Sequence, residues 1–306
     1  MRIALVLLFA LSVEAATKPQ IFALAYSPTA PIVATGGWKE VRLQDPSGKV
    51  INTLPGHIET VRALSFSKDG KRLAAAGGTP GKKGEVIVWS IEDAKPLVKF
   101  EGHSDAIFAI AFSPDGKQVA TSSYDKLIKL WDAETGKEVR TLKDHIDAVY
   151  SLAYTPDGTR LISGAADRTI KVWDPATGTR LFTLSEPTDG VNTVAVDPSG
   201  KFVAAGGLDK TIRVWALEPK AGRLVLTQIA HEDAILKLTW SPDGQNLVSS
   251  SADKSIKIFR ASDLTELKQI AKQPDWVYGI EFAPDSKTFL AGRYDGSLTT
   301  YENRGN

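Results

Sequence analysis

The chain has 306 residues, of which 42% are hydrophobic, enough for a sizeable core in one or two domains. Its 37 Lys and Arg against 36 Asp and Glu leave a net charge of +1, which argues against nucleic acid or an anionic membrane as the partner. The absence of cysteine excludes disulfides, thiol catalysis and zinc–thiolate sites.

The first 15 residues have the pattern of a secretory signal peptide. Arg2 precedes an uninterrupted apolar run at 3–11, and Val13-Glu14-Ala15 before Ala16 matches a small-residue cleavage site. We expect export to the periplasm or out of the cell, with residues 16–306 as one mature domain. The alternative is that residues 1–15 are retained as a β-strand of a cytoplasmic protein. No later apolar run approaches the ~18 residues of a membrane span.

Residues 20–302 consist of seven copies of a repeat of about 42 residues. FSPDGKQVATSSYDKLIKLWD (112–132) returns as YTPDGTRLISGAADRTIKVWD (154–174) and as WSPDGQNLVSSSADKSIKIFR (240–260). The copies leave no room for another domain. The aromatic residue that closes each copy is found at Trp89, Trp131, Trp173, Trp215, Phe259 and Tyr301, with Gln44 at this place in the first copy.

Each copy predicts four antiparallel strands. In the third copy a strand ends at Phe112, and the turn 113–116 has proline and glycine where a turn requires them. Further strands are expected at 118–122, 127–131 and 139–142. No segment has the apolar periodicity of a helix. The sequence therefore predicts an all-β, seven-bladed β-propeller of four-stranded antiparallel blades.

The chain resembles the WD40-repeat family over essentially all of its mature length. The resemblance rests on the pairs Gly56-His57 and Gly102-His103, on the SPDG turns, and on Trp131-Asp132 and Trp173-Asp174. It implies a non-catalytic scaffold that binds a protein or peptide. The alternative is a propeller enzyme or a small-ligand-binding protein that uses the central channel, because fold alone does not exclude function.

The four histidines occupy one position of the repeat, and in three copies an aspartate follows 22 residues later. With a nearby Ser or Thr, each set could be read as a hydrolase triad. A catalytic site is needed once, however, and this set occurs three times. The resemblance implies structural hydrogen-bond networks, formed by His103, Thr121, Asp125 and Trp131, by His145, Ser163, Asp167 and Trp173, and by His231, Ser249 and Asp253.

The other copies depart from this pattern. The second has His57 but Lys83 at the aspartate position, and the fifth has Asp209 without the histidine. Trp38 stands at the aspartate position of the first copy, and Gln273 at the histidine position of the seventh. Blades three, four and six are therefore expected to be the most rigid. With every histidine assigned to structure, and too few clustered carboxylates for a metal, we expect no catalytic residues, metal or cofactor.

The residue after the first apolar position of each first strand is expected at the mouth of the channel. Tyr, Trp and Arg are enriched at interface hot spots, which makes this face the expected binding surface. Alternatively, the rings only pack on one another. The candidate partner-binding residues are Phe22, Arg62, Phe108, Tyr150, Tyr278, Tyr124, Trp276, Arg293 and Tyr294, with Lys82 and Lys83 in an inserted loop, and Asn192 and Leu236 complete the ring.

The seventh copy ends at Tyr301, with too few residues after it for a turn and a fourth strand. In WD40 proteins the N-terminus usually supplies this strand. Counting back from Ile21 places Glu14 where other copies have an apolar residue. Cleavage at residue 15 would leave three strands in this blade, with an exposed edge at Leu298, Thr299, Thr300 and Tyr301. We expect a partner or a second copy to pair there.

Overall fold

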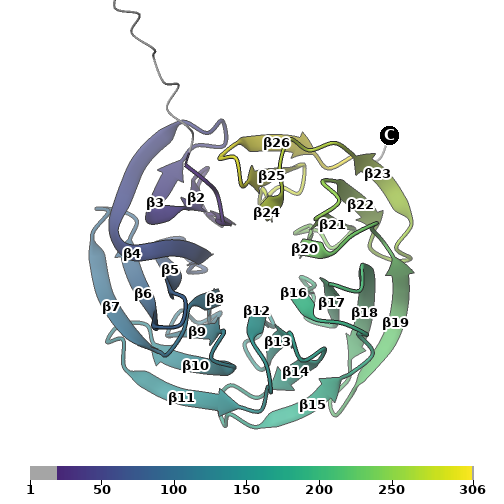
Figure 1. Cartoon of the computed structure of the whole chain (residues 1–306), viewed down its shortest axis with the longest axis horizontal. Coiled ribbons are helices and arrows are strands. Elements are labelled where there is room, and N and C mark those ends of the chain that lie inside the picture. The colour runs from purple at the N-terminus through teal and green to yellow at the C-terminus, as the bar shows by residue number, and fades with distance from the viewer. Residues whose placement is uncertain (1–18, 305–306) are drawn as a thin grey trace, which may run out of the picture.

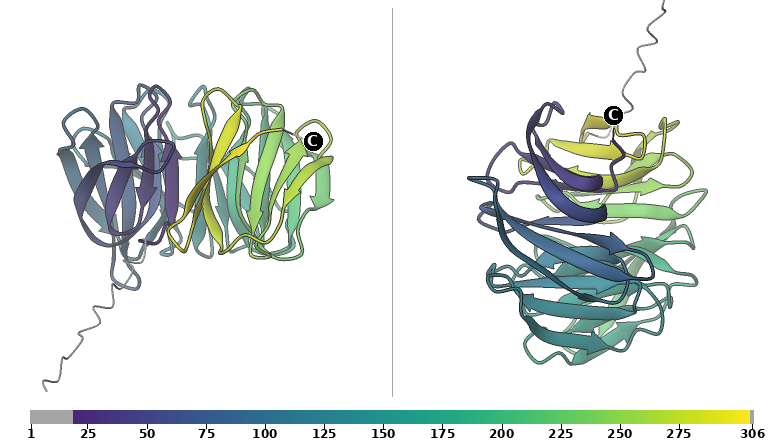
Figure 2. Two further views of the ribbon diagram at one scale, coloured as in Figure 1. Left: turned by 90° about the horizontal axis from the view of Figure 1, so that it is seen from above. Right: turned by 60° about the vertical axis from the view of Figure 1, so that its left-hand side comes forward.

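This computed structural model describes residues 19–304 of the chain, which form twenty-six β-strands and no helix. The strands surround a central opening (Figure 1) and build a flat disc (Figure 2). The predicted all-β propeller is confirmed. Within residues 19–304 there is accordingly no helix that could cross a membrane. The predicted signal peptide, residues 1–15, lies outside the described residues.

Blades 1 and 2 are joined through one long strand, β4. Blade 1 consists of β1 (Ala23–Tyr26), β2 (Val33–Gly36), β3 (Trp38–Gln44) and the first part of β4 (Val50–Phe66). Blade 2 consists of the last part of β4 with β5 (Arg72–Thr79), β6 (Lys83–Ser90) and β7 (Pro96–His103). Leu54 in β4 pairs with Val41 in β3, whereas Val61 pairs with Gly77 in β5. The seven-stranded sheet is therefore two blades, and β4 runs from the perimeter to the channel (Figure 1).

Blades 3 to 6 are separate four-stranded antiparallel sheets, each ordered from the channel outwards. Blade 3 contains β8 (Ile107–Phe112), β9 (Gln118–Ser123), β10 (Leu127–Asp132) and β11 (Glu138–Lys143). Blade 4 contains β12 (Val149–Tyr154), β13 (Leu161–Ala165), β14 (Ile170–Trp173) and β15 (Arg180–Leu184). Blade 5 contains β16 (Val191–Val196), β17 (Phe202–Gly207), β18 (Thr211–Leu217) and β19 (Gly222–Ile229). Blade 6 contains β20 (Ile235–Trp240), β21 (Asn246–Ser251), β22 (Ile256–Arg260) and β23 (Glu266–Ile270).

Blade 7 has three strands among the described residues, β24 (Val277–Phe282), β25 (Thr288–Arg293) and β26 (Leu298–Glu302). The ring closes here by face-to-face packing against blade 1. A Cβ atom at Gly279 would lie 2.4 Å from the Cβ of Leu24, so only glycine allows this approach. The Ile21 amide also donates a hydrogen bond to the Arg293 carbonyl at 3.2 Å. Blade 7 is thus anchored on its inner side while β26 forms its outer edge (Figure 1).

The core lies between neighbouring blades. Trp89 of blade 2, for example, packs in one cluster with Leu54 and Val61 of β4 and with Leu43 of blade 1. In blades 2 to 6 the turn after the first strand contains a glycine with positive φ. In blade 3 Gly116 has a φ of 70° and its amide donates to the Ser113 carbonyl at 2.8 Å, a conformation that glycine adopts without steric cost.

One residue near the start of each first strand of blades 2 to 7 is a β-bulge. The pairing register shifts between Val61 and Ala63 in β4, for example, and at the same point in β8, β12, β16, β20 and β24. A bulge leaves one residue out of the ladder and redirects its side chain. The strand that lines the channel therefore presents one extra side chain in each of these blades.

Candidate functional site

The bulged residues meet in one cavity of 380 Å³ at the mouth of the channel. Arg62, Phe108, Tyr150, Asn192, Leu236 and Tyr278 are the bulged positions, and Phe22, just before β1, takes the same place in blade 1. The structure thus brings together all seven residues that the repeat placed around the mouth. We call these seven residues the mouth ring.

Aromatic side chains occupy one side of the mouth ring. Phe108 and Tyr150 are in edge contact, with ring centroids 5.2 Å apart. On the other side of Arg62, Phe22 lies 5.6 Å from Tyr294 and 6.3 Å from Tyr278. Blades 5 and 6 contribute only Asn192 and Leu236 to the ring. The mouth is therefore asymmetric, with an aromatic arc over blades 7 and 1 to 4.

Arg62 lies in the middle of this arc. Its guanidinium carbon is 5.4 Å from the centroid of Phe108 and 5.8 Å from that of Phe22, which are cation–π distances. Its Nε atom is buried without a hydrogen-bond partner in residues 19–304, and Arg62 takes part in no ion pair formed there. Burial lowers the pKa of Arg62 below its ordinary value, yet arginine stays charged at neutral pH. The mouth therefore holds a positive charge that forms no ion pair within residues 19–304.

Apolar side chains are exposed on the loops around the mouth. These loops join second to third strands, or one blade to the next, so they lie on the face where the mouth opens. Sequence reasoning found Tyr124 and Trp276 here but missed three others, although the turn position and the apolar side chain were both readable. The exposed fractions lie between 41% and 79% for Trp38, Tyr124, Ile146, Leu208 and Trp276.

The assignment of Arg293 to this face is wrong. Its side chain is only 2% exposed and lies inside blade 7. From its position in β25 the side chain extends over the next strand, β26, and not into the channel. The guanidinium donates to Gln273 Oε1 at 2.6 Å and to Thr299 Oγ1 at 2.8 Å. Arg293 and Gln273 thus form a polar network where other blades have histidine, and Tyr294 remains at the mouth.

The two lysines of the inserted loop differ in their surroundings. Lys83 begins β6 and its Nζ atom lies 2.7 Å from Glu101 Oε1, while Lys82 is exposed. The Gly81 amide donates to Asp105 Oδ1 at 2.8 Å and ties the loop to blade 3. Of the two, Lys82 is the one that remains available to an acidic partner.

The histidine sets of blades 3 and 4 form complete networks inside the blades. In blade 4, His145 Nδ1 lies 2.7 Å from Asp167 Oδ2 and His145 Nε2 lies 2.7 Å from Ser163 Oγ, which also accepts from Trp173 Nε1 at 2.8 Å. Blade 3 repeats this arrangement with His103, Asp125, Thr121 and Trp131, at 2.8 Å for each contact. Both histidines are buried, so the geometry is that of a structural link and not of an accessible nucleophile.

The incomplete copies use other partners. In blade 6 His231 contacts Asp253 at 3.1 Å and Ser249 at 2.8 Å, but Phe259 cannot donate a hydrogen bond. In blade 2 the buried Glu85, which sequence reasoning missed, lies 3.2 Å from His57. In blade 5 Arg213 Nη1 lies 2.6 Å from Asp209, and Trp215 Nε1 donates to Glu186 Oε2 at 3.1 Å. The relative rigidity of the blades stays a prediction.

Glu281 is the acidic residue among the described residues that line the two cavities of the channel. Glu281 lines both the mouth cavity and a second cavity of 420 Å³ at the far ends of the first strands. Burial raises the pKa of Glu281 to about 7, and the positive charge of Lys237 opposes this rise. Among residues 19–304, no three His, Asp or Glu side chains are grouped as a metal site would require. The mouth cavity is thus lined by aromatic and apolar side chains together with the charged residues Arg62, Lys237 and Glu281.

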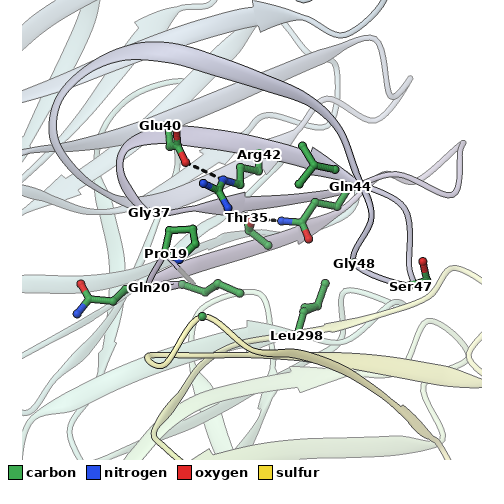
Figure 3. A pocket seen from close by; sticks show the side chains of 13 residues that line it. Pro19, Gln20, Thr35, Gly37, Glu40, Arg42, Gln44, Ser47, Gly48 and Leu298 are labelled. Atoms are coloured by element: carbon green, nitrogen blue, oxygen red, sulfur yellow. Dashed lines mark hydrogen bonds and ion pairs between the residues drawn. The ribbon is translucent and has the colours of Figure 1, made fainter. Parts of the chain in front are cut away.

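A second hollow lies at the edge of blade 7. A groove of 240 Å³ separates β26 from blade 1 and is lined by Leu298 on one side and by Thr35, Glu40, Arg42 and Gln44 on the other (Figure 3). At its end, the Thr300 hydroxyl donates to the Pro46 carbonyl at 3.2 Å. The edge at 298–301, which the sequence predicted to be exposed, therefore lies beside this groove.

Known proteins match this chain in two ways. A family model described as IFT122 first beta-propeller matches residues 106–306, and one described as WD domain, G-beta repeat matches residues 48–90. WD repeat and SOCS box-containing protein 1 of Homo sapiens is 34% identical over 67 residues, which is 21% of this chain and 16% of that protein. Protein HIR1 of Candida albicans is 32% identical over 73 residues, 24% of this chain and 8% of that protein. The similarity thus covers only a small part of these relatives.

Proposed function

The chain belongs to the WD40-repeat propeller family represented by the IFT122 first beta-propeller model, and we propose that it is a non-catalytic scaffold that binds a protein or peptide at the mouth ring. Proteins of this family are generally interaction scaffolds. The observation that carries the proposal for this face is the aromatic arc around Arg62, together with the exposed apolar loops beside it.

The chemistry of the mouth indicates what the partner presents. Trp276 and Tyr124 offer large apolar area at low conformational cost, as hot-spot residues do. Arg62 is charged, held between two rings and not ion-paired in the described part of the chain. A carboxylate beside an apolar side chain fits this pair of features, because it would give the guanidinium its missing hydrogen-bond acceptor. The proposed ligand is therefore an extended acidic–apolar peptide segment.

Selection from a displayed random-peptide library tests this proposal. We expect enriched peptides to carry an acidic residue beside an apolar one, and the variants Arg62→Gln and Trp276→Ala each to weaken binding about 10-fold or more, as loss of a hot spot does. Leu97→Ser, a change of an exposed apolar residue on the perimeter strand β7, is the control and should bind as the wild type does. Peptides that bind all four proteins equally would contradict the proposal.

We further propose that the protein works outside the cytoplasm. The support is the charged start, apolar run and small residues of positions 1–15. The expected result is an intact mass, for protein recovered from its native cell, that corresponds to a start at Ala16. A soluble cytoplasmic protein that retains residues 1–15 would contradict export.

A further inference from the structure

Six blades have a fourth strand among residues 19–304. In five of them this strand covers the same position of the third strand. At that position a large apolar residue of the third strand faces a large apolar residue of the fourth. The third-strand members are at most 1% exposed. The pairs are Val41 with Leu54, Val86 with Phe100, Ile128 with Leu142, Ile170 with Leu184 and Ile256 with Ile270.

Leu298 takes this position in blade 7 but lacks such a neighbour within residues 19–304. Its pairing with Gly292 in β25 corresponds to that of Ile128 with Ser122 in blade 3. Unlike Ile128, Leu298 is only partly buried, and Thr300 further along β26 is exposed. No strand of residues 19–304 pairs with the outer edge of β26. The apolar surface of Leu298 therefore faces the groove seen in Figure 3.

The opposite wall of the groove is polar but electrically balanced. Arg42 Nε lies 2.6 Å from Glu40 Oε1, and Gln44 Nε2 donates to Thr35 Oγ1 at 2.7 Å. The charges of this wall are thus paired with each other. A charged side chain inserted here would lose water without gaining a partner, whereas an aliphatic one would gain contact with Leu298.

We propose that β26 accepts an extended segment of another polypeptide chain as the fourth strand of blade 7. The segment runs antiparallel to β26, forms main-chain hydrogen bonds with its open edge and places an aliphatic or aromatic residue opposite Leu298, a mode known as β-strand addition. This site is on the perimeter of the disc, separate from the mouth ring, and does not depend on the function proposed for the mouth.

The chain's own fourth strands show which sequence the segment carries. They read INTL at 51–54, LVKF at 97–100, VRTL at 139–142, LFTL at 181–184 and LKQI at 267–270. The common pattern is an apolar residue, any residue, a Thr, Lys or Gln, and then the apolar residue that covers the third strand. A donor segment with this pattern would match both the register and the uncharged groove.

We favour a single extended segment over a second copy of this protein as the occupant of the β26 edge. The turn between β3 and β4 stands beside the edge, with Pro46 in contact with Thr300, and narrows the approach to β26. The fourth strands of another copy are paired on their inner side within their own blades, so a whole disc would have to dock beside this turn to present an outer edge. A single extended segment avoids both obstacles.

The test uses the full chain and a labelled synthetic peptide, GKEVRTLK, which copies residues 136–143. We expect saturable binding in fluorescence anisotropy, with slowed hydrogen exchange confined to the amides of 298–302. The peptide GKEVRTDK and the protein variant Leu298→Lys should each weaken binding at least 10-fold. Val139→Lys, which alters an exposed apolar residue of a paired strand, and Arg62→Gln should not.

Three results would overturn the proposal. The first is no binding at millimolar peptide, and the second is binding that leaves the exchange of β26 unchanged. The third is protection of β26 in the free protein, which would mean that the edge is already covered. Size-exclusion chromatography would then tell a second copy from the chain's own N-terminal residues. If peptides fail to bind the mouth ring but GKEVRTLK still binds β26, the proposed scaffold function is wrong and strand addition stands.

Discussion

Asp167→Ala should destabilise the propeller by about 3 kcal/mol, because it removes several hydrogen bonds to one buried carboxylate. Asp167 accepts from His145 Nδ1 at 2.7 Å, from Thr169 Oγ1 at 2.6 Å, and from the amides of Ile146 and Thr169 at 3.1 and 3.0 Å. The change leaves the buried His145 without its acceptor and frees the loop between blades 3 and 4. The midpoint of urea unfolding measures the effect.

Asp157→Ala is the matched control for this prediction. Asp157 also accepts from a hydroxyl, Thr155 Oγ1 at 2.6 Å, and from an amide, that of Thr159 at 3.0 Å, but it lies in an exposed turn. Water replaces these bonds after mutation, so we expect a loss of about 1 kcal/mol or less. Equal destabilisation by the two changes would contradict the expectation that the buried network in blade 4 stabilises the protein more than an exposed turn does.

The pH dependence of the same comparison follows from the pKa of Asp167. Burial raises that pKa, but the hydrogen bonds from His145 and Thr169 outweigh burial and lower it overall. A carboxyl whose pKa is lower in the folded state stabilises the fold above its unfolded pKa of about 3.9. This contribution is lost as the pH falls from there through the folded pKa. The gap between wild type and Asp167→Ala should therefore hold at neutral pH and narrow only in acid.

The fold could be predicted because the repeat encodes it several times. The closing aromatics fix the third strand of each blade, and the turn at 113–116 fixes the ends of the first two. The mouth ring could be found because one position recurs in every copy, although the bulge that redirects it was visible only as a break in the apolar alternation. β4 was not foreseen as one strand, because the pair Gly56-His57 did not indicate that Gly56 lies inside a strand with a φ of 115°.

The repeat could not show the places where two residues of one blade depart from the common pattern and form a new contact with each other. Glu85 takes over the role of the aspartate in blade 2 from a different strand position, so alignment pointed to Lys83 instead. Arg293 was assigned to the mouth face from its place in the repeat, but Gln273 supplies a buried acceptor that holds it inside blade 7. In both cases the partners are far apart in sequence, and only the packed blade brings them together.

Adding a fourth strand to blade 7 within the same chain should stabilise the protein. By alignment with blade 3, residues 303–306 correspond to the turn 133–136, so the residues KEVRTLK of 137–143 can follow Asn306 directly. Burial of the added leucine against Leu298 contributes about 1.5–3 kcal/mol. At about 2–4 °C per kcal/mol, the Tm should rise by about 3–12 °C. Calorimetry of the extended and the original chains measures the shift.

The extension KEVRTDK is the control, because its aspartate would face Leu298 and should leave the Tm unchanged or lower it. A chain whose Tm does not rise with KEVRTLK would mean that the edge of β26 does not accept a strand, or that another segment already covers it. Within residues 19–304, β26 has one unpaired edge, so an extension and a free peptide compete for the same main-chain groups. The extended chain should therefore no longer bind GKEVRTLK, whereas binding at the mouth ring, on a different face of the disc, should persist.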